Sequence, residues 1–294
     1  MAKILVVDGN SIMHRAFWAT PNLTTNGQPI NAVLTFLNIL YRTSSDIEAE
    51  NIIVAFDARE KTFRHKLYDE YKAGRQKTPD ELNSQFPIIK EFLETLGASV
   101  VECSGYEADD ILGTVAKQKS DDEVYLMTGD RDSFQLVSDK TSVLYVSTKM
   151  GRHQARIYTP RELELEYNLT PEQYIEYKAV LGDKSDNIIG VNGVGEKRAA
   201  ELFEKYGSIA GIYQNIEKLT PAVREAFLEF QERMPDVLTL VTINKNAPID
   251  KIDLQNYNFY STMFLDKLLE YNLKSLHKRL RRESEPDAEQ MGFL

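Results

Sequence analysis

The sequence has few of the residues that build disulfides and zinc sites. It contains one cysteine, Cys103, and four histidines that lie far apart in the chain. A lone cysteine cannot form an intrachain disulfide, and scattered histidines lack the spacing of zinc ligands, so a metal here would have oxygen ligands. A run of 18 apolar residues and a secretory signal are also missing, which predicts a soluble, cytoplasmic protein without a membrane partner.

An excess of positive charge is missing too. The chain has 35 Lys and Arg against 45 Asp and Glu, a net charge of −10. Nucleic-acid-binding proteins usually carry a basic footprint, so the total argues against such a partner. Nine of the carboxylates belong to the candidate site described below, however, and without them the remainder is nearly neutral and contains local basic runs. The charge therefore does not exclude DNA.

Short segments rich in Val and Ile alternate with helix-like segments in the first 150 residues. Five of them predict buried strands, at residues 3–8, 51–57, 98–102, 123–127 and 142–147. This alternation predicts an α/β fold, with a mostly parallel sheet and helices on both of its faces. In such a fold, ligands bind beyond the carboxyl ends of the strands.

Helices dominate the second half of the sequence. Four Thr-Pro pairs, beginning at Thr78, Thr159, Thr170 and Thr220, predict helix N-termini. The strand signal fades from about Thr159, and the last dozen residues are acidic and predicted to be disordered. We therefore expect a first domain over residues 1–170, a helical region over 171–282 and a tail over 283–294.

Acidic residues stand at or just after the ends of four successive predicted strands. They are Asp8, Asp57, Glu107, Asp109, Asp110, Asp130 and Asp132. A single acid at such a position caps a helix as often as it does chemistry, but the recurrence is harder to dismiss. Two unit charges ~4 Å apart repel by roughly 4 kcal/mol at an effective dielectric of about 20, so the cluster calls for cations. Mg²⁺ or Mn²⁺ suits oxygen ligands, and a metal pair can assist a phosphoryl displacement.

Two more acids follow in the run GDKSDN at residues 182–187. Asp183 and Asp186 are three residues apart and share a face if this segment is helical. The hydrophobic stretch before them could deliver both side chains to the same edge of the sheet.

A glycine-rich turn leads directly into a predicted helix after this run. Gly193 and Gly195 would leave backbone N–H groups free to hold a phosphate, and Lys197 and Arg198 add positive charge. A nucleotide P-loop is excluded because Glu196 stands where its lysine should be. The pattern favours a helix-hairpin-helix that grips the DNA backbone without reading sequence; a purely structural turn is the alternative.

The long connection between the second and third predicted strands, residues 58–97, carries cations interleaved with aromatics. At helical spacing two adjacent stripes form, one of Arg64, Tyr68, Lys72 and Arg75 and the other of Phe63, Leu67 and Tyr71. Such a surface suits a single strand of nucleic acid or a clamp on a scissile phosphate. A solvated amphipathic helix is the alternative.

These motifs together resemble one family. They are DGNS at 8–11 with RAF at 15–17, FD at 56–57, YKAGR at 71–75, EADD at 107–110, TGDRD at 128–132 and GDKSDN at 182–187. Over roughly residues 1–282 the chain is similar to the bacterial 5′-3′ exonuclease and flap endonuclease family, and in particular to the N-terminal nuclease domain of DNA polymerase I. No polymerase domain follows, so we expect a stand-alone enzyme. Ile189 stands where that family usually has proline.

The resemblance implies a PIN-like domain with a helical arch over about residues 62–97, followed by a helix-three-turn-helix region. It implies two Mg²⁺, for which Mn²⁺ can substitute, and K⁺ held by backbone oxygens near Gly190 to Gly195. The first metal would be held by Asp8, Asp57, Glu107 and Asp109, the second by Asp130, Asp132 and Asp186, with Asp110 and Asp183 as outer ligands. Catalytic cations would be Lys72, Arg75 and Arg15, and DNA contacts would come from Arg64, Tyr71, Gly193, Gly195, Lys197 and Arg198.

The implied function is a structure-specific 5′ nuclease for primer removal and repair. We expect a monomer in the bacterial nucleoid, acting on DNA with a 5′ flap or 5′ end and on RNA primer–DNA junctions. Two alternatives stay open at this point. One is a DNA-structure binding protein with weak or no catalysis, and the other is a PIN-type ribonuclease.

Two features near the C-terminus suggest further contacts. The run KSLHKRLRR at residues 274–282 either extends a track for duplex phosphates or is a solvated helix end. The final residues Gln290 to Leu294 are similar to the short peptides with which bacterial replication proteins bind the sliding clamp, so this clamp is an expected partner.

Overall fold

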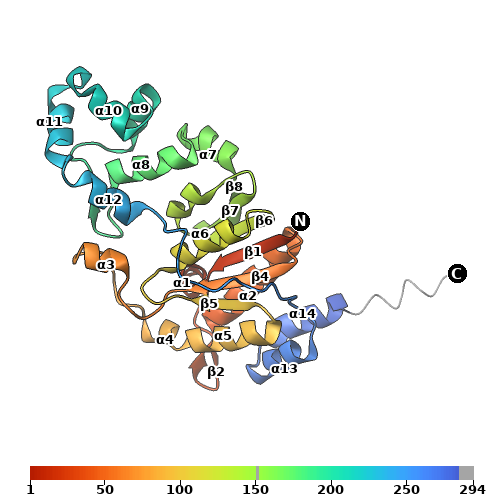
Figure 1. Ribbon diagram of the computed structural model, residues 1–294. Helices are drawn as coiled ribbons and strands as arrows, with labels where there is room; N and C mark the ends of the chain where they lie inside the picture. Colours follow the sequence, from red (N-terminus) through yellow and green to blue (C-terminus); the bar gives the residue numbers. More distant parts are fainter. Residues whose placement is uncertain (150–151, 285–294) are drawn as a thin grey trace.

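A six-stranded sheet forms the centre of the molecule. The computed structural model describes residues 1–149 and 152–284, and its main sheet has the order β5-β4-β1-β6-β7-β8 (Figure 1). The first five strands in this order are parallel and β8 is antiparallel to β7. The strands are β1 (Lys3–Asp8), β4 (Asn51–Phe56), β5 (Ser99–Glu102), β6 (Glu123–Thr128), β7 (Thr141–Lys149) and β8 (Arg152–Tyr158).

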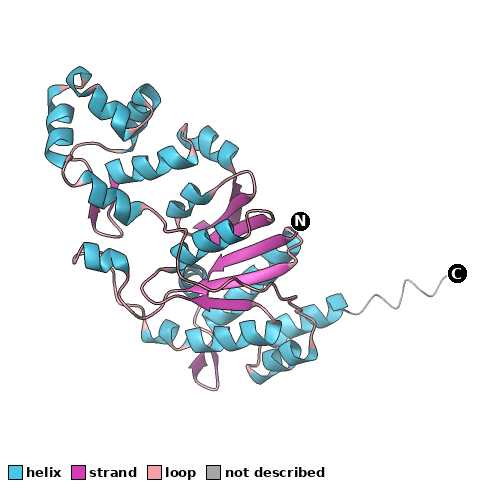
Figure 2. Cartoon of the chain, in the orientation of Figure 1, coloured by secondary structure: helices cyan, strands magenta, loops and turns pink. Residues whose placement is uncertain are grey.

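Helices cover both faces of this sheet, as Figure 2 shows. Alternate residues of β1 enter opposite cores, Ile4 and Val6 on one face and Leu5 and Val7 on the other, because side chains of a strand alternate. The first core includes α6 (Ala108–Gln118). The second includes α1 (Gly9–Ala19), α2 (Asn31–Asp46) and α5 (Gln85–Leu96). The predicted mostly parallel sheet with helices on both faces is thus confirmed.

The second half of the chain begins with a group of helices beside β8, at the upper left of Figure 1. These are α7 (Pro160–Tyr167), α8 (Pro171–Leu181), α9 (Glu196–Tyr206), α10 (Ile209–Gln214), α11 (Pro221–Phe230) and α12 (Met234–Val241). The predicted starts after Thr159, Thr170 and Thr220 are confirmed, since each Thr is the N-cap of its helix. The prediction at Thr78 is wrong by one residue, because Pro79 caps α4 (Asp80–Asn83).

The last two described helices return to the sheet. Although the sequence placed them in the helical region, α13 (Thr262–Glu270) and α14 (Lys274–Ser284) lie beside α5 (Figure 1). Leu268, Leu276 and Leu280 join the core on that side. None of the helices in the described part of the chain is long and apolar enough to cross a membrane.

Short elements complete the structure. Those near the site are α3 (Phe63–Leu67), the 3₁₀ helix η1 (Arg131–Leu136), β9 (Gly182–Asp183) and β10 (Ile188–Ile189). The others are β2 (Thr24–Thr25), β3 (Gln28–Pro29) and the 3₁₀ helix η2 (Ile216–Lys218).

Candidate active site

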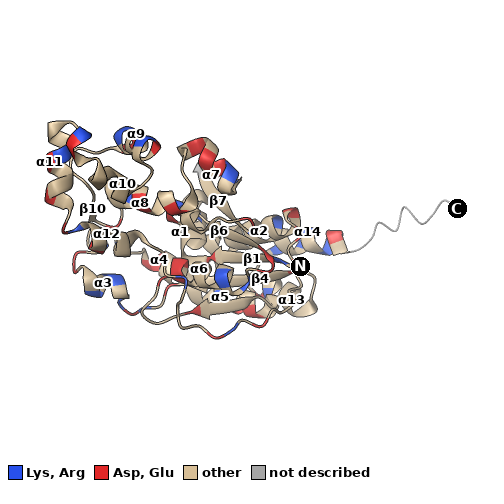
Figure 3. Cartoon of the chain, turned by 45° about the horizontal axis from the view of Figure 1, so that its top comes forward, with Lys and Arg blue, Asp and Glu red and all other residues tan. Residues whose placement is uncertain are grey.

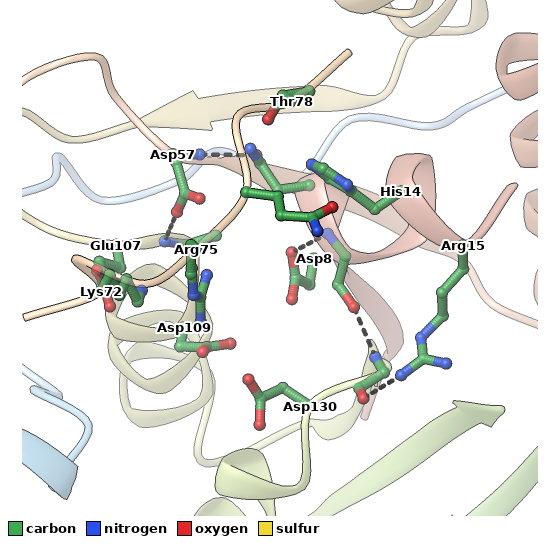
Figure 4. Close-up of a pocket in the computed structure, with 15 residues that line it drawn as sticks. Asp8, His14, Arg15, Asp57, Lys72, Arg75, Thr78, Glu107, Asp109 and Asp130 are labelled. Carbon is green, nitrogen blue, oxygen red and sulfur yellow. Dashed lines mark hydrogen bonds and ion pairs between the residues drawn. The ribbon is translucent and has the colours of Figure 1, made fainter. Parts of the chain in front are cut away.

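Five of the predicted acids line one cavity at the carboxyl edge of the sheet. Asp8 ends β1, Asp57 directly follows β4, Glu107 and Asp109 open α6, and Asp130 follows β6 by two residues. The cavity has a volume of about 530 Å³ and is also lined by Arg15, Lys72 and Arg75. Figure 4 shows Asp8, Asp57, Asp109 and Asp130 surrounding a common space. Four segments that are distant in sequence therefore deliver carboxylates to one place.

Asp8 is buried and Asp109 is half-buried in the deepest part of the cavity. Asp8 accepts hydrogen bonds from the backbone N–H of Ser11 (2.9 Å) and the hydroxyl of Thr128 (2.8 Å). Burial and the nearby charge of Asp57 nevertheless raise the pKa of Asp8 to about 7. Burial, with Asp8 as the strongest charged neighbour, also raises the pKa of Asp109. Oδ1 of Asp109 has no hydrogen-bond partner among the described residues. This part of the cavity is short of positive charge.

The donor set fits a hard divalent cation. All the candidate ligands are carboxylates, which suit Mg²⁺ or Mn²⁺, and the unpartnered Oδ1 of Asp109 provides a free ligand atom. Within residues 1–149 and 152–284, no group of three or more Asp, Glu, His or Cys side chains is already gathered closely enough to hold an ion. Ion binding would therefore require the carboxylates to move closer together.

Basic side chains of the arch engage two of the carboxylates. Lys72 Nζ lies 2.6 Å from Oε1 of Glu107 and 3.9 Å from Oδ2 of Asp186. Arg75 pairs with Asp186 and is the more exposed of the two cations. The backbone N–H of Lys72 donates to the carbonyl of Asp186 at 2.9 Å, which docks the arch on the turn between β9 and β10. Lys72 and Arg75 thus face the cavity, as the sequence predicts.

A second group of acids surrounds a lysine that the sequence analysis missed. Lys178 Nζ on α8 lies 2.7 Å from Asp132 and 2.8 Å from Asp183. Burial opposes the charge of Lys178, but Asp132 and Asp183 outweigh it and raise the pKa of this lysine. Burial and Asp130 raise the pKa of Asp132 to about 7. Only the three-dimensional structure pairs Lys178 with Asp132, which lies 46 residues away in the sequence.

Three predicted assignments need correction. Arg64 and Tyr71 were expected to face DNA, but both side chains are buried, and the helix expected to present them ends at Leu67. Asp110 was expected near the metals, but it is fully buried and forms two 2.8 Å hydrogen bonds with the Arg64 guanidinium. Arg64 and Asp110 can both be buried because the charge of the guanidinium balances the charge of the carboxylate. Tyr71 instead lies 3.0 Å from both Glu107 and Asp186 through its hydroxyl.

Arg15 forms part of the cavity wall. Its guanidinium donates to the carbonyl of Gly129, and a Cβ on Gly129 would collide with Nε of Arg15. A side chain at position 129 would therefore displace the Arg15 guanidinium from this wall. His14 lines the same cavity and was not singled out in the sequence. The sequence could have indicated His14, because it lies three residues after Ser11 on α1 and therefore on the same side of the helix.

The predicted hairpin lies at the start of α9. Gly193 has a positive φ of 69°, which favours glycine, and Gly195 caps α9. Lys197 and Arg198 are exposed in the first turn, as the blue segments of α9 in Figure 3 illustrate. The turn and these side chains line a second cavity of about 530 Å³. An exposed helix N-terminus with basic side chains is suited to hold a phosphate.

The C-terminal basic run lies elsewhere. In α14 Lys274, Lys278, Arg281 and Arg282 are exposed, but Figure 1 places this helix far from α9 and the hairpin. The run therefore does not continue the hairpin surface in the described structure. The expected clamp-binding residues, Gln290 to Leu294, lie outside the described residues.

Two family models match most of the chain. Residues 3–168 match the family model "5'-3' exonuclease, N-terminal resolvase-like domain", and residues 169–262 match "5'-3' exonuclease, C-terminal SAM fold". DNA polymerase I of Bacillus subtilis (strain 168) is 40% identical over 98% of this chain and 33% of that protein. Thermostable DNA polymerase I of Thermus aquaticus is 38% identical over 84% of the chain and 29% of that protein. The chain spans about a third of the length of the curated relatives it matches.

Solved structures share the fold. T5 5′-exonuclease with bound zinc superposes with a TM-score of 0.66 at 23% identity, covering 96% of this chain and 100% of that one. The catalytic core of Rad2 in complex with a DNA substrate gives a TM-score of 0.61 at 14% identity, covering 96% of this chain and 90% of that one. At these identities the likeness concerns the fold.

Proposed function

Because the chain belongs to the 5′-3′ exonuclease family, we propose that it is a structure-specific nuclease that hydrolyses DNA phosphodiesters at 5′ ends and 5′ flaps. One observation carries the proposal: five carboxylates at the carboxyl edge of the sheet share a cavity with Arg15, Lys72 and Arg75. Negative side chains that can hold cations and positive side chains that can hold a phosphate thus face the same space.

The carboxylates would hold two Mg²⁺ ions, and Mn²⁺ could replace them. Asp8, Asp57, Glu107 and Asp109 would serve one ion, and Asp130, Asp132 and Asp186, with Asp183 farther out, would serve the other. When bound, the ions would supply an activated water and charge stabilisation for the leaving 3′ oxygen, which yields a 5′-phosphate and a 3′-hydroxyl. The raised pKa values of Asp8 and Asp132 support a demand for cations at both places.

Lys72 and Arg75 would position the scissile phosphate. They now neutralise Glu107 and Asp186, whose oxygens would be needed as metal ligands. Once those carboxylates have other cations, the ammonium and guanidinium groups are free to donate to phosphate oxygens from the same side of the cavity. Arg15, held against Gly129 at the opposite wall, adds positive charge there.

The hairpin before α9 would hold the adjoining duplex through its backbone. The exposed turn at Gly193 and Gly195, with Lys197 and Arg198, supports a contact with phosphates, and K⁺ bound by backbone oxygens near Gly190 to Gly195 would strengthen it. We propose that the protein acts as a monomer on flaps and RNA primer–DNA junctions in the bacterial nucleoid.

Cleavage of a 5′-labelled flap tests this function. Wild-type protein should cut the flap with Mg²⁺ and not with EDTA, and Asp130→Ala should lose most of the activity. Asp139→Ala is the matched control, because Asp139 is exposed on the turn before β7. Equal rates for Asp130→Ala and wild type would refute the assignment. Faster cleavage of single-stranded RNA than of flap DNA would favour a ribonuclease instead.

A further inference from the structure

Five successive residues, the last two of α12 and the three that follow it, are held by side chains from other parts of the molecule. Residues 240–244 each contribute one backbone group: the carbonyls of Leu240, Val241 and Thr242 and the N–H groups of Ile243 and Asn244. The side chains that bind them are Arg64, Gln135 and Asp110, and all three are buried. Buried backbone groups need such partners, so the position of this segment is tightly defined.

Arg64 uses all of its N–H groups in this junction. Nε donates to Leu240 O and Nη2 to Thr242 O, both at 2.9 Å. Nη1 and Nη2 also donate to the two oxygens of Asp110 at 2.8 Å, and Nη1 lies 3.4 Å from Oε2 of Glu107. The five donors of the guanidinium are thereby engaged. The same side chain thus touches the end of α12 and a carboxylate of the cavity.

Gln135 makes the equivalent connection to the other group of acids. Its amide Nε2 donates to Val241 O at 3.0 Å, and its Oε1 accepts from the N–H of Ile243 at 2.8 Å. Gln135 lies on η1, the turn that also carries Asp132 and is capped by Asp130. Movement of residues 241–243 would therefore displace η1, the element that carries Asp132 and is capped by Asp130.

The other end of the junction leads to the hairpin. α12 packs against α8 and α3, and α8 in turn packs against α9. α8 also carries Lys178, which pairs with Asp132 and Asp183. The hairpin and the carboxylates are thus joined by two series of packed elements: one passes directly from α8 to η1, and the other passes through α12 and residues 240–244.

We propose that residues 240–244 couple duplex binding at the hairpin to cation binding at the carboxylates, with Arg64 and Gln135 as positioning residues. Arg64 sets the place of Glu107, and Gln135 sets the place of the turn carrying Asp130 and Asp132. This inference rests on the proposed function and adds a thermodynamic linkage to it: each ligand should strengthen the binding of the other by the same factor.

The linkage can be measured without cleavage. A fluorescent duplex closed by a loop at each end has no 5′ terminus to place at the carboxylates, so it reports on the hairpin. The Kd of this duplex is measured once in EDTA and once in Ca²⁺, at matched ionic strength. Ca²⁺ is used because it binds oxygen ligands, as Mg²⁺ does. We expect wild-type protein to bind roughly 5-fold or more tightly with Ca²⁺. Gln135→Met and Arg64→Lys should bring this ratio toward one.

Gln85→Met is the matched control. Gln85 is also a fully buried glutamine that holds backbone, accepting from the N–H groups of Ala32 and Val33, but it lies on the other face of the sheet. This variant should lose comparable stability and keep the wild-type ratio. The proposal is overturned if wild type shows no Ca²⁺ effect, or if Gln135→Met and Arg64→Lys keep the full effect.

A second measurement uses wild-type protein alone. Adding Ca²⁺ without DNA should slow hydrogen exchange of the amides of Ile243 and Asn244, while those of Ala32 and Val33 serve as the reference. Unchanged exchange at all four amides would contradict the coupling even if a variant failed to fold. A protein that shows the linkage but does not cut flaps would refute the proposed function and leave this inference standing.

Discussion

Asp109 and Asp110 follow each other in α6 and meet very different surroundings. Successive helical residues point about 100° apart, so Asp109 lines the cavity while Asp110 faces the junction. Asp110 receives hydrogen bonds from Arg64 and from the N–H groups of Glu107 and Asn244. Oδ1 of Asp109 has no hydrogen-bond partner in the part of the chain that the structure describes. Asp110 therefore has its counter-charge within the protein, whereas Asp109 is available to bind a cation from solution.

Substitution of these two acids should have opposite effects on stability. Asp110→Asn leaves the buried Arg64 guanidinium without its closest counter-charge, and should lower the free energy of unfolding by about 3–5 kcal/mol. Asp109→Asn replaces a half-buried carboxylate whose Oδ1 has no partner among the described residues, and should leave the stability in EDTA equal or higher. Urea unfolding in EDTA measures both. An Asp110→Asn variant as stable as wild type would show that the pair is not structural.

At the scale of elements, α8 connects the acids around Lys178 to the hairpin. It ends at Leu181, and the chain turns at once into β9. Lys178, one turn before that end, holds Asp132 of η1 and Asp183 of β9 together. This ammonium group occupies carboxylate oxygens that a divalent ion would use, so the two cations compete for the same ligands.

Removal of the ammonium should therefore make the protein more responsive to Mg²⁺. Lys178→Met should be less stable than wild type in EDTA, because Asp132 and Asp183 lose their partner. The rise in Tm on adding Mg²⁺ should be larger for this variant than for wild type. Lys184→Met, at an exposed lysine next to Asp183, is the control. Equal Mg²⁺ responses in Lys178→Met and wild type would exclude the competition.

The arch contains a shorter helix than its sequence pattern predicted. Helical spacing predicted one continuous helix through Arg75, but α3 ends at Leu67 and Tyr68 adopts an extended conformation. The chain leaves the helix where it gains distant partners: the Tyr71 hydroxyl reaches Glu107 and Asp186, and the Lys72 N–H reaches Asp186. Those partners lie 36 to 115 residues away in the sequence, so periodicity could not include them.

At the scale of the whole molecule, burial determined what could be predicted. The strands at the centre of the sheet are apolar on both faces, so β1 and β4 were found nearly to the residue. β8 was missed because its sequence, RHQARIY, is that of a polar edge strand. The return of α13 and α14 to the sheet was also missed, since nothing local in an amphipathic helix says which core it will join.

Part of the candidate site could also be predicted from the positions of the strands. Strand ends placed Asp8, Asp57 and Asp130 in one cavity, because parallel strands bring their carboxyl ends to one edge. The sequence could not show which acids already have a basic partner in the fold. That information depends on Arg64 and Lys178, whose partners come from other elements.

The crowded carboxylates predict how the stability of the whole molecule depends on pH. In the folded protein the pKa values of Asp8 and Asp132 are about 7, against an ordinary value of 3.8. The folded state therefore binds more protons between these values, and this contribution to stability is lost as the pH rises through 7. Mg²⁺ should offset the loss, so it should raise Tm more at pH 8 than at pH 5. An equal gain at both pH values would contradict the predicted link.

The count of bound ions tests the central claim most directly. Titration of the DNA-free protein with Mn²⁺, followed by electron paramagnetic resonance, should show two ions per chain. Asp8→Asn and Asp132→Asn should each remove one of them, because these residues belong to different groups of acids. Binding of no ion, or of two ions in both variants, would mean that these carboxylates do not form the metal centre proposed above.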